Sequence, residues 1–396
     1  MQKIKIPWGI SDEFEESLFT FFILRAHGLL KTTTTAAVRD KHQNQQHMKK
    51  KMLGICCLFF LVFAGARAQQ QPYYTQYMLN NFILNPALAG IENYWDFKTS
   101  YRAQWEGING APTTAYLTVH GPLGKNIGYD KETPTTVHTA DENQLGGKAF
   151  WMEYTAPPAH QGIGLTILDD KTGPLSRIAA YASYAYHLPV GKKTSLSLGV
   201  SLGAQELMVD MNELNFGQAN PVDPAVFGSK YLNQIKPDIN AGLWLSSPNF
   251  FIGASAQQIV PLPVDYNDEK ISGDSITLLK GKLVPHLFLT TGCKLLLTDE
   301  VSVLPSVMIT YVQPVPIGLD INAKIQYLDV FWLGFSYRYK NGFAGLMGLN
   351  ISSMFNLGYS YGYATTALNT VSHGTHEIVL GFLLRKNSSS STRTDY

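Results

Sequence analysis

Charged residues are scarce in this sequence: Asp, Glu, Lys and Arg together make up 15% of its 396 residues, against about 25% in an ordinary soluble domain. The two signs nearly cancel, giving a formal net charge of +1, and this balance gives no reason to expect a nucleic-acid partner. After residue 68 the sequence also lacks any run of about 20 apolar residues, which excludes a membrane-spanning helix in that part of the chain.

Cysteine is nearly absent as well. Cys56 and Cys57 lie in an apolar segment near the N-terminus, and Cys293 stands alone beyond it. Once that segment is removed, no intrachain disulfide can form. A small secreted domain usually needs such cross-links, whereas a closed barrel does not, because all of its strands are paired by hydrogen bonds.

The apolar segment has the features of a secretory signal peptide. A basic stretch at residues 48–51 precedes the apolar residues 52–64, and Ala66-Arg67-Ala68 matches the small-x-small cleavage pattern. We therefore expect cleavage after Ala68 and export from the cytoplasm. We take Met48 as the true start and residues 1–47 as an upstream extension without function; the alternative is a long signal extension with a role of its own.

What the chain has in abundance is the alternation of apolar with small or polar residues. In residues 317–327, Ile, Leu, Ala and Tyr occupy the odd positions, and Gly, Asp, Asn, Lys and Gln the even ones. Residues 195–204 alternate Leu and Val with Ser and Gly in the same way. A period of two predicts a strand whose faces meet different environments. Because the second face is rich in Ser, Gly, Asn and Thr, it fits a wet lumen better than the surface of a soluble sandwich.

The sequence therefore predicts an all-β protein, an antiparallel transmembrane β-barrel of about 14 strands within residues 92–385. A short N-terminal plug or periplasmic segment at 69–91 precedes it, and a polar tail at 386–396 follows. The predicted strands are 94–105, 112–120, 160–169, 175–188, 193–206, 237–246, 249–258, 284–297, 300–312, 317–327, 330–340, 342–351, 353–363 and 374–385.

The predicted connections fall into two classes of length. Outer-membrane barrels have short turns on the periplasmic side and long loops outside, so we expect each class to gather at one end of the barrel. The short connections are 189–192, 247–248, 298–299, 328–329 and 341–342, and the long ones are 121–159, 207–236 and 259–283.

Nothing in the sequence forms a convincing catalytic or metal site. His373 and His376 lie close to Glu377, but on a strand they lack the helical spacing of a zinc protease. The glycine-rich residues 342–348 lack the lysine and the strand–helix setting of a phosphate-binding loop. We therefore expect no enzymatic activity, no metal and no cofactor.

Four motifs resemble those of the PorP/SprF family of the type IX secretion system. The first is a Q-Y-M segment at Gln76 followed by N-P-A-x-A-G from Asn85, and the second is Y-R-x-Q-W at Tyr101–Trp105 with Pro112-Thr113-Thr114 beyond it. The third runs from Gly162 to Asp170, and the fourth is Gly374-Thr375-His376-Glu377-Ile378. The resemblance covers most of residues 70–385. Thr375 departs from the usual Ser, and Gly362 stands where the family often has Asp.

This resemblance implies an outer-membrane component of type IX secretion and gliding machinery that assists the export or surface attachment of a partner protein. The implied partners are outer-membrane lipid, a secreted surface protein or adhesin, and a periplasmic, peptidoglycan-linked component. It places partner binding on the motif residues Gln76, Tyr77, Asn85, Pro86, Tyr101, Arg102, Trp105, His376 and Glu377.

Two other functions and one structural choice stay open at this point. A porin or hydrophobic-solute channel would have the same strand pattern, and a secreted β-sandwich adhesin is a third interpretation. Residues 76–90 lack clean alternation, and Asn85-Pro86 ends any helix that begins there. The segment is therefore either a plug that packs the barrel or a docking surface for a partner. Arg102 shares a strand face with Gln104 and is a candidate to face the lumen.

Overall fold

A computed structural model describes residues 75–124, 154–213, 231–264, 281–298, 300–328, 330–351 and 354–384. The predicted upstream extension at 1–47, the signal peptide at 48–68 and the tail at 386–396 lie outside these residues. No helix in the described ranges is long and apolar enough to cross a membrane.

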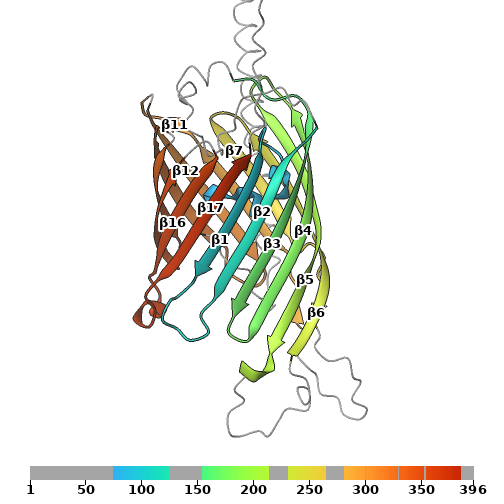
Figure 1. Ribbon diagram of the computed structural model, residues 1–396, viewed down its shortest axis with the longest axis vertical. Coiled ribbons are helices and arrows are strands. Elements are labelled where there is room, and N and C mark those ends of the chain that lie inside the picture. Colours follow the sequence, from blue (N-terminus) through green and yellow to red (C-terminus); the bar gives the residue numbers. More distant parts are fainter. Residues whose placement is uncertain are drawn as a thin grey trace, which may run out of the picture. The chain divides into compact units, whose positions relative to one another are not determined.

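Within the described residues, 14 antiparallel strands form one closed ring (Figure 1). The first and last strands pair with each other along nine residues, from Trp95 opposite Leu384 to Ala103 opposite His376. In chain order the strands are β1 (Trp95–Ala103), β2 (Thr113–Leu123), β3 (His160–Thr172), β4 (Leu175–Pro189), β5 (Ser195–Asp210), β6 (Tyr231–Ser246), β7 (Phe250–Gln257), β10 (His286–Cys293), β12 (Val301–Val312), β13 (Gly318–Tyr327), β14 (Phe331–Arg338), β15 (Gly342–Asn350), β16 (Phe355–Ala364) and β17 (Thr375–Leu384).

The remaining elements are short. β11 (Leu295–Leu296) follows β10 after Lys294 and also pairs with β12, and β8 (Pro263–Val264) pairs with β9 (Gly281–Lys282) in a separate ladder between β7 and β10. The 3₁₀ turns are η1 (Tyr77–Leu79), η2 (Asn81–Ile83), η3 (Pro86–Leu88), η4 (Met211–Glu213) and η5 (Ala367–Thr370).

The predicted barrel and its 14 strands are confirmed. The largest difference is at β6, which begins at Tyr231 instead of residue 237. The predicted strand starts at Pro237, a residue that interrupts strands, but the ladder with β5 continues upstream of it, with Pro237 opposite Ala204 and Tyr231 opposite Asp210. Pairing with a long neighbouring strand therefore overrides the local breaker signal.

The two faces of each strand meet opposite environments, as β13 shows. Ile321 and Ile325 point outward and are 45% and 51% exposed, whereas Asp320, Asn322 and Lys324 point into the ring and are buried. A soluble protein would bury the apolar set. An apolar outer surface around a polar interior is the arrangement of a barrel surrounded by lipid.

The ring has two rims, and strand order decides which connection lies at which rim. The terminal rim carries the start of β1 and the end of β17, and the far rim is the opposite one. Connections that follow the second, fourth and sixth strands return to the terminal rim, and those that follow the first, third, fifth and seventh lie at the far rim.

One expectation about the connections is wrong. The long connection 121–159 follows β2 and so begins at the terminal rim, whereas 207–236 and 259–283 follow β5 and β7 and lie at the far rim. The short turn at 341–342 also lies at the far rim, between β14 and β15. The length of a connection does not determine its rim. Because each strand crosses the barrel once, the number of strands that precede a connection determines the rim at which it lies.

Candidate functional site

Residues 75–94, called the luminal segment below, lie inside the ring. They carry η1, η2 and η3 and contact strands all around the barrel through the hydrogen bonds described next. Asn85 sets the last turn locally: its side chain accepts a hydrogen bond from the Ala87 amide (3.0 Å), and Pro86 begins η3 with its fixed φ. The apolar side chains of η1 to η3 are buried together.

The start of the luminal segment is held by β17. The Thr75 amide donates to a carboxylate oxygen of Glu377 (2.9 Å), and the Gln76 side-chain amide donates to the Glu377 carbonyl (2.7 Å). Arg102 on β1 is the register partner of Glu377, and both are buried. This pair of opposite charges thus lies on the seam where the first and last strands close the ring.

The middle of the segment contacts side chains on β2, β12 and β13. The Asn322 side chain on β13 donates to the Tyr77 hydroxyl, the Ser306 hydroxyl donates to the Met78 sulfur (3.6 Å), and the Asn80 side chain donates to the Thr118 hydroxyl (2.9 Å). Burial, followed by the nearby Asp320 carboxylate, raises the pKa of the Tyr77 phenol above its ordinary value. Tyr77 therefore stays protonated and neutral in the lumen.

Strands β6 and β7 bind the backbone that follows. Gln257 donates to the Ile83 carbonyl (2.9 Å), Ser255 donates to the Leu84 carbonyl (2.7 Å), and the Asn85 side chain donates to the Leu243 carbonyl (2.9 Å). The Ile83 and Leu84 carbonyls lie in an irregular segment with no sheet partner of its own. The barrel side chains supply the missing hydrogen bonds, as buried backbone requires.

Histidines of consecutive strands hold the end of the segment. His187 on β4 donates from Nε2 to the Ala89 carbonyl (2.8 Å), and its Nδ1 lies 2.6 Å from the Ser197 hydroxyl. The Gly90 amide donates to Nδ1 of His120 on β2 (3.3 Å), and the rings of His160 and His187 stack at 4.4 Å. Because a carbonyl can only accept, the His187 proton is on Nε2.

Glycines of the wall let the segment approach the strand backbone. A Cβ atom at Gly162 or Gly199 would lie within 3.0 Å of backbone atoms of Ala89 and of Ala87, respectively. A Cβ at Gly358 would similarly meet the side chains of Gln76 and Leu79. These glycines come from β3, β5 and β16. The wall is therefore shaped to receive this particular segment.

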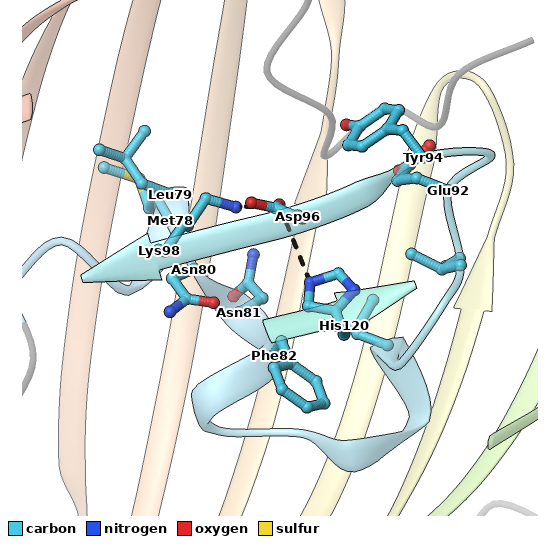
Figure 2. A pocket seen from close by; sticks show the side chains of 12 residues that line it. Met78, Leu79, Asn80, Asn81, Phe82, Glu92, Tyr94, Asp96, Lys98 and His120 are labelled. Atoms are coloured by element: carbon cyan, nitrogen blue, oxygen red, sulfur yellow. Dashed lines mark hydrogen bonds and ion pairs between the residues drawn. The ribbon is translucent and has the colours of Figure 1, made fainter. Parts of the chain in front are cut away.

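A small charged cavity borders the segment toward the terminal rim (Figure 2). The Lys98 ammonium bonds the Asp96 carboxylate, whose Oδ2 is 3.8 Å from Nε2 of His120, and the Phe82 ring packs on His120 at 4.5 Å. The cavity measures about 40 Å³, which holds a few water molecules and no organic ligand.

A larger cavity opens on the other side of the segment, at the far rim. It measures about 350 Å³ and reaches from Thr75 and Arg102 to the far-rim turns. Trp105 and Lys340 in two of these turns have left-handed backbone, with φ of 55° and 62°. The described residues contain no group of His, Cys, Asp and Glu that could hold a metal ion.

The structure separates the predicted partner-binding residues into three groups. Six of them lie inside the barrel, Tyr101 is 57% exposed on its outer face, and Trp105 lines the far-rim cavity. His376 points outward, with Nε2 3.2 Å from the Glu106 carboxylate and Nδ1 2.8 Å from the Tyr359 hydroxyl. Their role in partner binding stays a prediction. The six inner residues are Gln76, Tyr77, Asn85, Pro86, Arg102 and Glu377.

Sequence reasoning missed the wall glycines and two cations of the far-rim cavity. Gly199 and Gly358 lie in strands with alternating burial, at positions that face the lumen. The alternation in the sequence could therefore have identified them as lumen-facing residues. Arg338 lies two residues after Ser336 and faces the lumen as Ser336 does, so alternation could also have identified it. Its Nε donates a hydrogen bond to Asp320 at 3.0 Å. Lys340 lies in a turn, where alternation gives no information.

One family profile matches most of the chain. The profile of the type IX secretion system membrane protein PorP/SprF matches residues 66–382. No curated protein sequence matched the chain.

Solved structures similar to the chain include two toluene transporters and a FadL homologue. The toluene transporter TbuX of Ralstonia pickettii is 12% identical, with 81% of this chain and 95% of that chain covered and a TM-score of 0.42. The toluene transporter TodX of P. putida is 11% identical, with 79% and 95% covered and a TM-score of 0.42. A FadL homologue of Pseudomonas aeruginosa is 9% identical, with 80% and 95% covered and a TM-score of 0.43.

Proposed function

Because the chain belongs to the PorP/SprF family of type IX secretion system membrane proteins, we propose that this outer-membrane barrel assists the export or surface attachment of a partner protein. The observation that carries the proposal is the occupied lumen. The chain's own luminal segment is bonded to strands around the ring, so the polar interior does not serve as a free path for solutes. What the barrel offers to other molecules is its two rims.

The rims are assigned to the two sides of the membrane by the ends of the first and last strands. An even number of strands puts the start of β1 and the end of β17 at the terminal rim, and a barrel that inserts from the periplasm keeps these strand ends on that side. The far rim, with the connections 207–236 and 259–283, then faces the cell exterior. The connection 121–159 lies on the periplasmic side by the same reasoning.

This assignment gives each partner a place. The secreted surface protein or adhesin binds the far rim, where two long connections offer area for a protein interface. The peptidoglycan-linked periplasmic component binds the terminal rim, at the connection 121–159. With these partners, the proposed role covers secretion and gliding motility at the cell surface.

Export of the chain itself depends on the signal peptide, and we expect cleavage between Ala68 and Gln69. Intact-mass and N-terminal peptide analysis of the protein purified from outer membranes should find Gln69 as the first residue. Peptides from residues 1–47 in the purified protein would contradict both the cleavage and the absence of a role for that extension.

The two partner assignments predict separable losses. Replacing residues 125–153 with a Gly-Ser linker should abolish copurification of the periplasmic component and leave the surface protein bound. Replacing residues 214–230 should do the reverse, because that connection lies at the other rim. Affinity purification of each tagged variant from outer membranes, with mass spectrometry of the bound proteins, measures both.

The paired design also contains its control, since each variant is a loop replacement of the same kind. Equal retention of both partners by both variants would refute the rim assignment. Export of the surface protein undiminished in a strain that lacks the barrel would refute the proposed function itself.

A further inference from the structure

The far-rim cavity collects residues from two of the sequence motifs and the residue that precedes a third. Arg102, Gln104 and Trp105 come from the Y-R-x-Q-W motif, Thr375 comes from the last motif, and Thr75 directly precedes the Q-Y-M segment. These residues are far apart in the chain and meet only because β1 pairs with β17 around the luminal segment. The volume of about 350 Å³ lies in the usual range of small-ligand pockets.

The charges that face this cavity have one sign. Arg102, Arg338 and Lys340 line it, and none of the described lining residues is Asp or Glu. Two carboxylates lie beside these cations in the lumen: Asp320 is buried against Nε of Arg338 (3.0 Å), and Glu377 is buried and accepts a hydrogen bond from the Thr75 amide (2.9 Å). The Asp320 carboxylate thus holds the Arg338 guanidinium in place, and Glu377 lies opposite Arg102 in the register of β1 and β17.

The rim of the cavity is built from constrained turns and apolar groups. The left-handed backbone of Trp105 is held by the hydrogen bond from its amide to the Thr375 hydroxyl (3.3 Å). The left-handed Lys340 places its ammonium 5.3 Å from the centre of the Tyr339 ring. Left-handed non-glycine residues gather at ligand clamps, where the surroundings enforce them. The constrained residues here are an aromatic ring and a cation.

We propose that the far-rim cavity binds an organic anion, whose carboxylate lies against Arg102, Arg338 and Lys340 and whose apolar body packs against Trp105. Guanidinium groups match a carboxylate in shape and charge, and the indole supplies the apolar surface. A carboxylate of this kind is supplied by the free end of a polypeptide or by a small organic acid. Binding does not require the secretion role, so the two proposals fail independently.

The test is calorimetric titration of the mature protein in a neutral detergent. The probes are the peptide acetyl-Ala-Ala-Phe with a free carboxyl end, the same peptide with an amidated end, and 3-phenylpropionate. We expect the acids to bind and the amide not to bind. Tighter binding of the peptide acid than of 3-phenylpropionate identifies a chain end as the source, and equal binding identifies a small acid. Absence of binding by both acids overturns the proposal.

A substitution at Gly362 tests the charge of the wall. A Cβ there would lie 3.4 Å from the Thr375 Cβ, so a side chain fits with little strain. Gly362→Asp should weaken binding of the acid about tenfold or more through repulsion of like charges, while the neutral, isosteric Gly362→Asn should retain it. Equal affinity of the two variants would overturn the proposal, provided that both show the heat-dependent gel migration of a folded barrel.

Lys340→Asn provides a second, independent variant. Asn tolerates left-handed backbone, so the turn keeps its conformation while the charge is lost. We expect weaker binding of the acid, with a smaller dependence of the affinity on salt concentration than in the unaltered protein. An unchanged affinity and salt dependence would exclude Lys340 from the site and contradict the proposed position of the carboxylate.

Discussion

Deleting residues 75–90 is expected to convert a barrel of low conductance into one with a large, stable pore. The luminal segment fills the ring through bonds to Glu377, Thr118, Asn322 and Gln257. The wall behind it is largely polar, so water can replace the lost contacts without exposing a continuous apolar surface. Single-channel recording in planar bilayers measures the effect, with the unaltered mature protein beside the deletion variant.

The control for this deletion is removal of residues 214–227, which shortens a far-rim connection and leaves the luminal segment in place. Both variants should still migrate differently on denaturing gels before and after boiling, which reports an intact barrel. A large, stable pore in the unaltered protein would instead favour the porin or solute-channel alternative. A deletion variant that stays closed with its barrel intact would show that something else blocks the lumen.

The strand pattern was predictable because alternation reports a local environment. Asp320 and Ile321 differ in burial for the reason that the sequence indicates, since one faces the lumen and the other the lipid. Arg102 was a candidate for the lumen on the same ground, and it is buried there. The positions of strand ends depend on neighbours instead: β6 starts at Tyr231 because β5 continues to Asp210.

Contacts across the lumen could not be predicted in this way. Arg102 and Glu377 face each other only because the first strand pairs with the last, and the alternation of each strand carries no information about its partner. The luminal segment has no period at all, so the sequence left open whether it packs inside or docks elsewhere. The structure places it inside, while a contact with a periplasmic partner stays a prediction.

The wall glycines yield the second large prediction: Gly162→Ala and Gly199→Ala together should displace the luminal segment. Each added methyl would overlap backbone atoms, at Ala89 and at Ala87, which cannot rotate away as a side-chain end can. Overpacking costs about 1–3 kcal/mol at one site. Both methyl groups would press on the same short segment, at Ala89 and at Ala87, so the two substitutions act on one contact partner and their costs are coupled. We expect frequent channel openings and faster proteolysis of the segment, both absent from the unaltered protein.

Gly345→Ala is the matched control, because Gly345 lies on the outer face and a Cβ there meets nothing within 4 Å. It adds one methyl group to the outer face of another strand without touching the lumen, and it should conduct as little as the unaltered barrel. If the double variant also stays closed and protease-resistant, β3 and β5 have shifted to accommodate the added methyl groups. Shape complementarity at these glycines then does not retain the segment. Retention would then rest on the hydrogen bonds at Glu377, Gln257 and His187, whose acceptors and donors the glycine substitutions leave intact.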